Sequence, residues 1–294
     1  MAELRTIAGV ASKYFAQKYK NPGIHITKKG AEAYFDRLLG LLYPQLQPRG
    51  SVFKSADELS LELDKAQLEL NYLLRNIGYQ NSRGPISNLT DEFFHSLDGI
   101  VSQLDEDIDF ALESNPSLKS RDQIIICYPG FYALSAYRIS NFFYKKKVPI
   151  FPRLISEYAH RVTQMDINPG ATIAAPFFPK DATGLVIGEM SHIGKRVKIG
   201  QNVTLGAIAV YKELQDQKRH PTIEDDVEIC ANSVVLGGKT VIGKGSIIES
   251  NVLVVKSVPP YSRVSQVKKQ IQPPLEIPIQ RTVERPVELS AAFQ

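Results

Sequence analysis

Aliphatic residues recur at every sixth position between residues 187 and 258. The positions in this phase are Ile187, Ile193, Ile199, Leu205, Ile223, Ile229, Leu236, Ile242, Ile248 and Val254, with one seven-residue step before Leu236. A period of six fits neither an isolated amphipathic helix nor a strand that alternates with a period of two. It is typical of a hexapeptide β-helix, in which each hexad forms one short strand and one turn.

A second series of mostly small side chains follows four residues behind the first. It contains Ser191, Val197, Val203, Ala209, Val227, Ser233, Thr240, Ser246, Val252 and Val258. We expect the large aliphatic side chains to point into the coil, the smaller ones to fit its inner corners, and stacked coils to bury a continuous apolar column. A β-sandwich with coincidental spacing is the alternative, and ten positions in phase weigh against it.

The first 160 residues carry a helical pattern instead. Apolar residues stand at helical spacing through 59–78, where Ser60 or Asp57 is the candidate N-cap. Further helices are expected at 29–45, 90–113, 130–144 and 150–162, punctuated by prolines.

The predicted fold class is therefore α+β and multidomain. A helical N-terminal domain is expected at 1–160 and a parallel β-helix at 161–262. The tail at 263–294 is rich in Pro and Gln, and it is expected to be extended or partly disordered.

Composition and charge narrow the function classes. The net charge of +4 is too mild to indicate nucleic-acid binding. No apolar run reaches transmembrane length, and the first residues lack the layout of a signal peptide. Cys127 and Cys230 lie far apart and form no metal motif, so reduced thiols in a cytoplasmic protein without a metal site are expected.

One polar excursion interrupts the hexads, at residues 211–222 (YKELQDQKRHPT). It ends in Arg219, His220 and Pro221. Solenoids tolerate insertions as loops on one face, and such loops are often functional. This loop is therefore the first candidate for chemistry.

Several motifs occur in a specific order along the chain. They are PGFYALSAYRI at 129–139, DI-x-PGA at 166–171, ATG-x-VIGE at 182–189, NVTLGA at 202–207 and RHP at 219–221. In this combination the chain resembles the serine O-acetyltransferases of cysteine biosynthesis, over roughly residues 105–262. The resemblance implies a left-handed β-helix and transfer of acetyl from acetyl-CoA, a co-substrate rather than a bound cofactor, to the L-serine hydroxyl. It also implies sites between the subunits of a homotrimer, with paired trimers forming a hexamer as an alternative.

The chemistry of that reaction indicates what the site must provide. A hydroxyl is a poor nucleophile, so a base must accept its proton, and the developing oxyanion needs hydrogen-bond donors. A substrate carboxylate is best held by a forked guanidinium.

The resemblance assigns roles to particular residues. Asp166 matches the family Asp that orients a catalytic His. Arg219 matches the Arg that holds the serine carboxylate, and His220 matches the second active-site His. Glu189 matches a Glu near the site. The positions that match the border of the CoA pantetheine arm are Gly206, Ala207 and Ala231. The alternatives are that Asp166 caps a turn and that Glu189 is a solvated side chain.

Other positions depart from the family pattern. Asn168 replaces a His, and Lys180-Asp181 replaces an Asp-His pair, so Asp181 stands where the family carries its main base. Asn115 stands where an acidic residue contacts the serine ammonium group. His220 is expected to take over the base role, and activity is expected to depend on His220 and Arg219 more than on Asp181. The alternative is that Asp181 inherits the base role. His192 is expected on the surface, with a position in the cleft as the alternative.

These departures leave three functions open. The first is serine O-acetyltransferase activity. The second is a weak or inactive paralogue that binds CoA, and the third is an acyltransferase for a different hydroxyl acceptor that carries a carboxylate. The family's partner sulfhydrylase grips a C-terminal Ile, whereas this sequence ends Ala-Ala-Phe-Gln, so we do not expect that complex.

Overall fold

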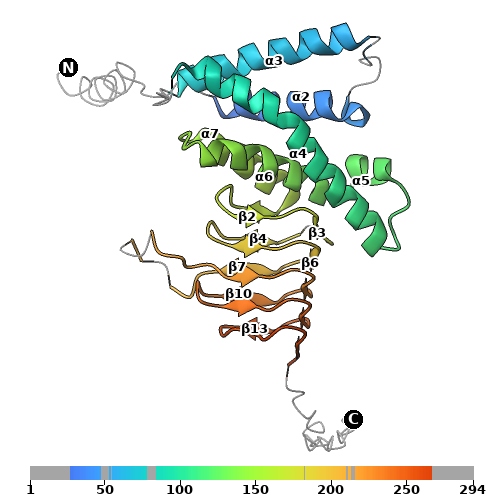
Figure 1. The fold of residues 1–294 in the computed structure, drawn as a ribbon, viewed down its shortest axis with the longest axis vertical. Coiled ribbons are helices and arrows are strands. Elements are labelled where there is room, and N and C mark those ends of the chain that lie inside the picture. Colours follow the sequence, from blue (N-terminus) through green and yellow to red (C-terminus); the bar gives the residue numbers. More distant parts are fainter. Residues whose placement is uncertain are drawn as a thin grey trace, which may run out of the picture.

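The computed structural model describes residues 27–47, 53, 55–77, 84–181, 183–209, 211–212 and 216–266. Figure 1 shows a helical part stacked on a column of short strands. The helical part consists of α2 (Lys28–Leu42), η2 (Pro44–Leu46), α3 (Ala56–Asn76), α4 (Ile86–Ser114), α5 (Arg121–Cys127), α6 (Pro129–Lys145) and α7 (Phe151–Thr163). No helix in the described ranges is both long and apolar enough to cross a membrane.

The start of α3 differs from the prediction. Its N-cap is Ser55, whose side chain accepts a hydrogen bond from the backbone N–H of Glu58, so neither Ser60 nor Asp57 caps the helix. Asp57 and Glu58 lie in the first turn instead, where carboxylates interact favourably with the helix dipole. The spacing alone had placed the helix start a few residues too late.

The column is built from short parallel strands. They are β1 (Asp166–Ile167), β2 (Thr172–Ile173), β3 (Phe177–Pro179), β4 (Val186–Ile187), β5 (His192–Ile193), β6 (Val197–Ile199), β7 (Thr204–Gly206), β8 (Thr222–Ile223), β9 (Glu228–Ile229), β10 (Val234–Leu236), β11 (Val241–Ile242), β12 (Ile247–Ile248), β13 (Leu253–Val254) and β14 (Arg263–Val264). They form three sheets, in the orders β1-β4-β7-β10-β13, β2-β5-β8-β11 and β3-β6-β9-β12-β14. Each of the first four turns of the chain adds one strand to each sheet, and the last turn adds β13 and β14 to two of them. This arrangement confirms the predicted β-helix.

The interior of the column follows the hexad phase. Ile187, Ile199, Leu205 and Ile229 are at most 1% exposed, as expected for inward positions. One position was wrong: Val235 is fully buried and pairs with Leu205, whereas Leu236 is only partly buried. The extra residue therefore lies after Val235, in the turn that contains Gly237.

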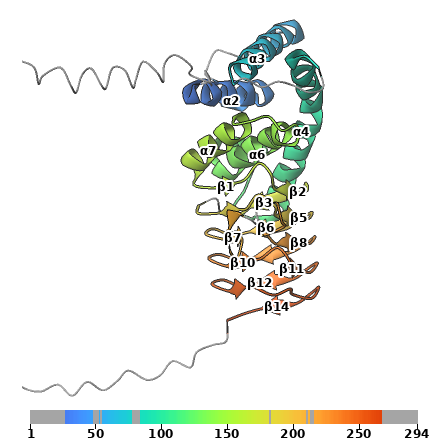
Figure 2. The ribbon, with the colours of Figure 1, turned by 90° about the vertical axis from the view of Figure 1, so that its left-hand side faces the viewer.

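The helical part is fastened to the first coil by buried polar contacts. Asp107 of α4 pairs with Arg138 of α6 and also accepts a hydrogen bond from the backbone N–H of Phe177 in β3. The Tyr137 hydroxyl donates to the carbonyl of Ala171. Burial raises the pKa of Asp107 to about 6, although Arg138 opposes this shift. Figure 2 shows α6 and α7 lying directly on the first coil.

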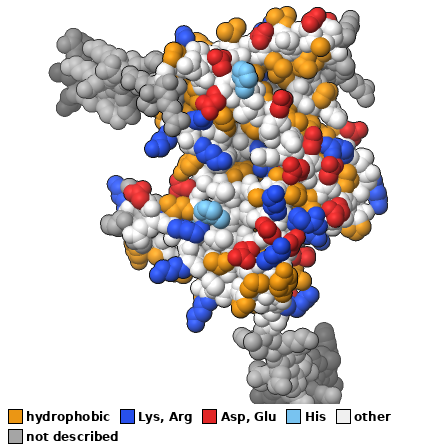
Figure 3. All heavy atoms as spheres, in the orientation of Figure 1, with side chains coloured by type: hydrophobic (Ala, Val, Ile, Leu, Met, Phe, Trp, Pro, Cys, Tyr) orange, Lys and Arg blue, Asp and Glu red, His pale blue; other side chains and the backbone are white. Residues whose placement is uncertain are grey.

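A groove lies at the helical end of the molecule. Helices α3 and α4 leave a groove with an apolar floor that includes Leu63, Phe94 and Val101 and a rim that includes Asp64 and Asp98. Figure 3 shows hydrophobic and acidic side chains together over this end of the molecule.

At the other end of the molecule, β14 continues the column two residues past the predicted boundary at 262. The predicted tail lies mostly outside the described residues, and the three-part division remains a prediction.

Candidate active site

The Arg-His-Pro segment brings a histidine against the solenoid wall. His220 precedes β8, and its side chain is buried, with 8% of the residue exposed. Its ring lies over Gly188, at the end of β4. A Cβ atom at residue 188 would lie 2.0 Å from His220 Cδ2 and 2.3 Å from Nε2. The glycine of the VIGE motif therefore leaves the space that the imidazole fills.

A backbone contact determines which nitrogen of His220 carries the proton. The N–H of Met190 donates to His220 Nδ1 over 3.1 Å. A backbone N–H can only donate, so this bond requires an unprotonated Nδ1 and assigns the proton of the neutral ring to Nε2. Burial, Arg219 and Lys218 lower the pKa of His220, while Glu189 opposes them. The ring is therefore a neutral group that presents an Nε2–H donor.

Arg219 is held by the Glu189 carboxylate, which a phenol holds in turn. Its Nη2 donates to Glu189 Oε2, and the Tyr144 hydroxyl donates to Glu189 Oε1 over 2.6 Å. Burial alone would raise the pKa of Glu189, but these hydrogen bonds and the charge of Arg219 lower it overall. Glu189 is thus an ionised carboxylate that orients the guanidinium, rather than a freely solvated side chain.

Gly170 of the PGA motif makes room for this arrangement. A Cβ atom there would lie 2.7 Å from Tyr144 Cζ and 2.8 Å from Glu189 Cγ. No sequence motif indicated Tyr144, which lies in the last turn of α6, far from Glu189 in sequence. Its hydroxyl remains protonated, because burial and Glu189 raise its pKa to about 12.

A second basic pair lies beside this cluster. His192 is exposed, as predicted, and its Nδ1 lies 3.1 Å from Lys218 Nζ. Lys218 also donates to the carbonyl of Met190, and burial lowers its pKa. The backbone of Met190 therefore accepts a hydrogen bond from Lys218 at its carbonyl and donates one from its N–H to His220.

Among the described residues, the positions that depart from the family pattern (Asn115, Asn168 and Asp181) are not bonded to Arg219, His220 or Glu189. Asn168 Oδ1 accepts from the N–H of Gly170 over 2.9 Å, and Asn115 Oδ1 accepts from the N–H of Ser117 over 3.0 Å. Both side chains therefore close their own turns. Asp181 is exposed after β3, and no hydrogen bond or ion pair joins it to another described residue. Asp166 lies at the start of β1, 3.6 Å from Arg153.

The three positions assigned to CoA lie on turns and strand ends of the column. Gly206 ends β7, Ala207 follows it, and all three positions including Ala231 are partly exposed. Ala231 lies in the turn before β10, the neighbour of β7 in the sheet. Gly206 and Ala207 therefore lie where β7 ends, whereas Ala231 lies before the parallel strand β10 begins, and the CoA role of all three stays a prediction.

Comparison with known proteins gives the family. No family model matches the chain. A serine acetyltransferase of Synechococcus elongatus, described as a plasmid protein, is 42% identical over 61% of this chain and 58% of its own length. The serine acetyltransferase of Bacillus pumilus is 41% identical over 55% of this chain and 72% of its own length. The chain thus spans less than two thirds of the first relative and more than two thirds of the second.

Solved structures agree with the sequence relatives. The native serine acetyltransferase 1 of Entamoeba histolytica is 27% identical, with a TM-score of 0.71 over 82% of this chain and 87% of that one. A serine acetyltransferase of Brucella abortus in complex with Coenzyme A is 25% identical, with a TM-score of 0.56 over 81% of this chain and 79% of that one. Identity, coverage and fold together place this chain in the serine acetyltransferase family.

Proposed function

We propose that this protein is a serine O-acetyltransferase, which transfers acetyl from acetyl-CoA to the L-serine hydroxyl and releases O-acetylserine and CoA. The observation that carries the proposal is the cluster of Arg219, His220 and Glu189. It sets a guanidinium beside a buried imidazole donor on the solenoid wall. The named activity of the relatives and the CoA complex of the Brucella protein support the same substrates.

The acceptor carboxylate is assigned to Arg219. Five N–H donors in a planar fork suit a carboxylate, and Glu189, itself bonded to Tyr144, holds one nitrogen of that fork. The serine hydroxyl then attacks the thioester carbonyl, so a C–O bond forms as the C–S bond breaks. The hydroxyl proton passes to a base and finally to the departing thiolate.

His220 is assigned as a donor to the oxygen that becomes negative. Its Nε2–H can stabilise that oxyanion while Met190 holds Nδ1. A base role at Nε2 would require a proton on Nδ1, and two N–H groups would then face each other. The hydroxyl proton is therefore assigned to Asp181, which stands at the family's base position. Because Asp181 is exposed, we expect Asp181→Asn to be milder than His220→Ala.

A homotrimer is the assembly we propose, since the family forms its sites between subunits. The exposed apolar side chains of Leu253, Val255 and Tyr261 near the end of the column support a surface that another copy covers. Pairing of trimers into a hexamer and a cytoplasmic location stay predictions. Light scattering that shows a monomer at micromolar concentration would contradict the trimer.

A weak or inactive CoA-binding protein is the second candidate. It is favoured by Asn115 and Asn168, whose side chains serve their own turns. The test is thiol release from acetyl-CoA with L-serine and with hydroxy acids that lack the ammonium group. Preference for serine supports the proposal, and preference for the hydroxy acids indicates a different acceptor.

Calorimetry with CoA completes this test. We expect binding in wild type and weaker binding in Ala231→Trp, because the indole would fill the proposed pantetheine groove. Binding without turnover of any acceptor would favour the inactive protein. An unchanged affinity in Ala231→Trp would place CoA elsewhere.

A further inference from the structure

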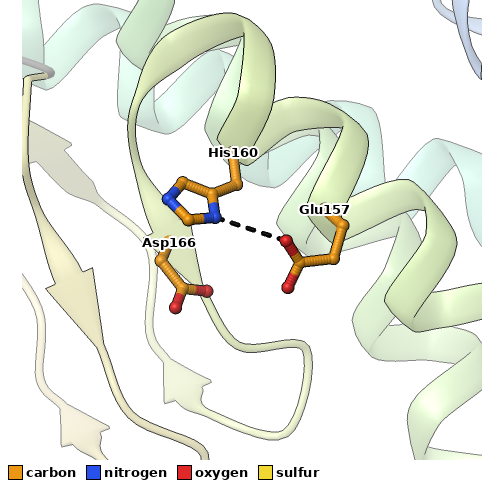
Figure 4. A group of neighbouring side chains, drawn as sticks. All are labelled: Glu157, His160 and Asp166. Carbon is orange, nitrogen blue, oxygen red and sulfur yellow. Dashed lines mark hydrogen bonds and ion pairs between the residues drawn. The ribbon is translucent and has the colours of Figure 1, made fainter.

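A mixed cluster of metal-binding side chains lies outside the Arg219–His220 site. Glu157 and His160 are three residues apart on α7, and Asp166 begins β1 after the turn. One imidazole nitrogen and one oxygen of each carboxylate all lie within 4.8 Å of one another. Figure 4 shows the three head groups turned toward a common centre. We propose that these three residues form a binding site for a divalent transition metal, of which Zn²⁺ fits best.

The distances suit such a site. His160 Nδ1 and Glu157 Oε2 are 3.3 Å apart. Zinc bonds of about 2.0–2.2 Å to histidine nitrogen and carboxylate oxygen set neighbouring ligand atoms roughly 3.3 Å apart in a tetrahedron. Glu157 and His160 therefore already span one edge of a zinc tetrahedron. Asp166 offers a carboxylate oxygen within 4.8 Å of both and would supply the third corner.

The donor set indicates which metal the proposed site would prefer. One imidazole and two carboxylates match the ligands of zinc, whereas Ca²⁺ takes six or more oxygen ligands. The side chains of Glu157, His160 and Asp166 are 43%, 42% and 28% exposed. This access leaves the fourth position to water, as in zinc sites with three protein ligands.

The surroundings already attract positive charge. The cluster lies at the C-terminal end of α7, where the helix dipole favours cations. Arg153 contacts Glu157 Oε1 over 2.5 Å and Asp166 Oδ1 over 3.6 Å. Glu157 thus turns one oxygen to Arg153 and the other to His160. Arg153 can remain on the outer oxygens, where a hydrogen-bonded partner orients ligating carboxylates.

The same guanidinium also competes with the metal for the carboxylate charge. Removing Arg153 should therefore tighten metal binding, while removing His160 should weaken it. These opposite effects distinguish a metal site from a cluster of ordinary hydrogen bonds.

The test is calorimetry of Zn²⁺ with the tag-free, chelator-treated full chain. We expect one Zn²⁺ per chain, at least tenfold weaker binding in His160→Ala, and tighter binding in Arg153→Gln. His95→Ala is the matched control, because His95 is a histidine of α4 outside the cluster, and its affinity should equal wild type. Zn²⁺ should also raise the Tm of wild type more than that of His160→Ala.

A second variant protects the test against misfolding. If His160→Ala without metal has a lower Tm than wild type without metal, Glu157→Gln is tested in its place, because it keeps the shape of the side chain. We expect Glu157→Gln to bind Zn²⁺ at least tenfold more weakly than wild type. Absence of Zn²⁺ binding by wild type up to millimolar concentration would overturn the proposal. Equal affinity in wild type and in the folded cluster variant would also overturn it. Both readouts are independent of acetyl transfer, so they remain decisive if the protein proves inactive.

Discussion

The Arg219–His220 cluster and the positions that depart from the family pattern differ in what holds their side chains. His220 is fixed by Met190 and by the space over Gly188, and Arg219 is fixed by Glu189. Asn115 and Asn168 instead bond to their own turns, and Asp181 faces solvent. The difference indicates that the side chains proposed to bind the acceptor and the oxyanion are held in place within the chain, whereas the residue proposed as the base is not.

The largest expected effect comes from removing the imidazole. His220→Ala should lower kcat by about a hundred- to a thousandfold, as loss of one oxyanion donor does elsewhere. His220→Gln keeps an N–H donor on a side chain that does not titrate, so it should retain clearly more activity than alanine. Steady-state kinetics of both variants measure this. Equal losses in the two would mean that His220 is a base, and the contrast between the two regions would fail.

A substitution at Gly188 tests whether activity depends on the packing of the His220 ring against the column. Gly188→Ala places a methyl group on the His220 ring, so we expect kcat to fall by about tenfold to a hundredfold and Tm to fall. Gly99→Ala is the control, because no atom lies within 4 Å of a Cβ there. In the helix α4 that change should stabilise by about 0.5–1 kcal/mol. An unchanged kcat in Gly188→Ala would mean that the ring can move without loss.

The sequence predicted the column well because its packing is local. Each coil repeats the same inward and corner positions, so a period of six reports burial directly, as at Ile199. The exception, Val235 instead of Leu236, arose because an apolar pair leaves the phase ambiguous beside an inserted residue. Ser55 was missed as a cap for a related reason, since several cap-forming residues stand close together.

The site was less predictable because it depends on contacts between distant segments. Tyr144 and Glu189 meet only after α6 packs on the first coil, and no spacing indicates that pair. The proton position on His220 depends on a backbone N–H, which carries no side-chain signal. Resemblance supplied Arg219 and His220, and the structure supplied what holds them.

Arg219 gives the next prediction. Arg219→Ala should chiefly raise the KM for serine, by about tenfold to a hundredfold, because a hydrogen bond to a charged group contributes about 1.5–3 kcal/mol. The KM for acetyl-CoA should change little. Arg263→Ala is a control, because Arg263 lies on the last strand, β14, away from the cluster, and pairs there with Glu249. A fall in kcat with an unchanged serine KM would contradict carboxylate binding by Arg219.

The smallest effect is a shift of the pH profile. The neutral ring accepts the Met190 N–H, and protonation of Nδ1 would break that bond, so activity should be lost as His220 becomes charged. Burial lowers the pKa of His220 below the ordinary histidine value of 6.5, so the acid limb of kcat/KM should lie below pH 6.5. Glu189 opposes this shift, because its negative charge favours the imidazolium.

Glu189→Gln should therefore move the acid limb to still lower pH, because it removes the charge that favours the imidazolium. Arg219→Gln should move it to higher pH, because Arg219 lowers the pKa of His220. Profiles measured in one buffer series on the three proteins test the signs directly. If the limb stays in place in both variants, the group that titrates is not His220. In that case the contrast between the packed cluster and the departing positions does not extend to the pH dependence.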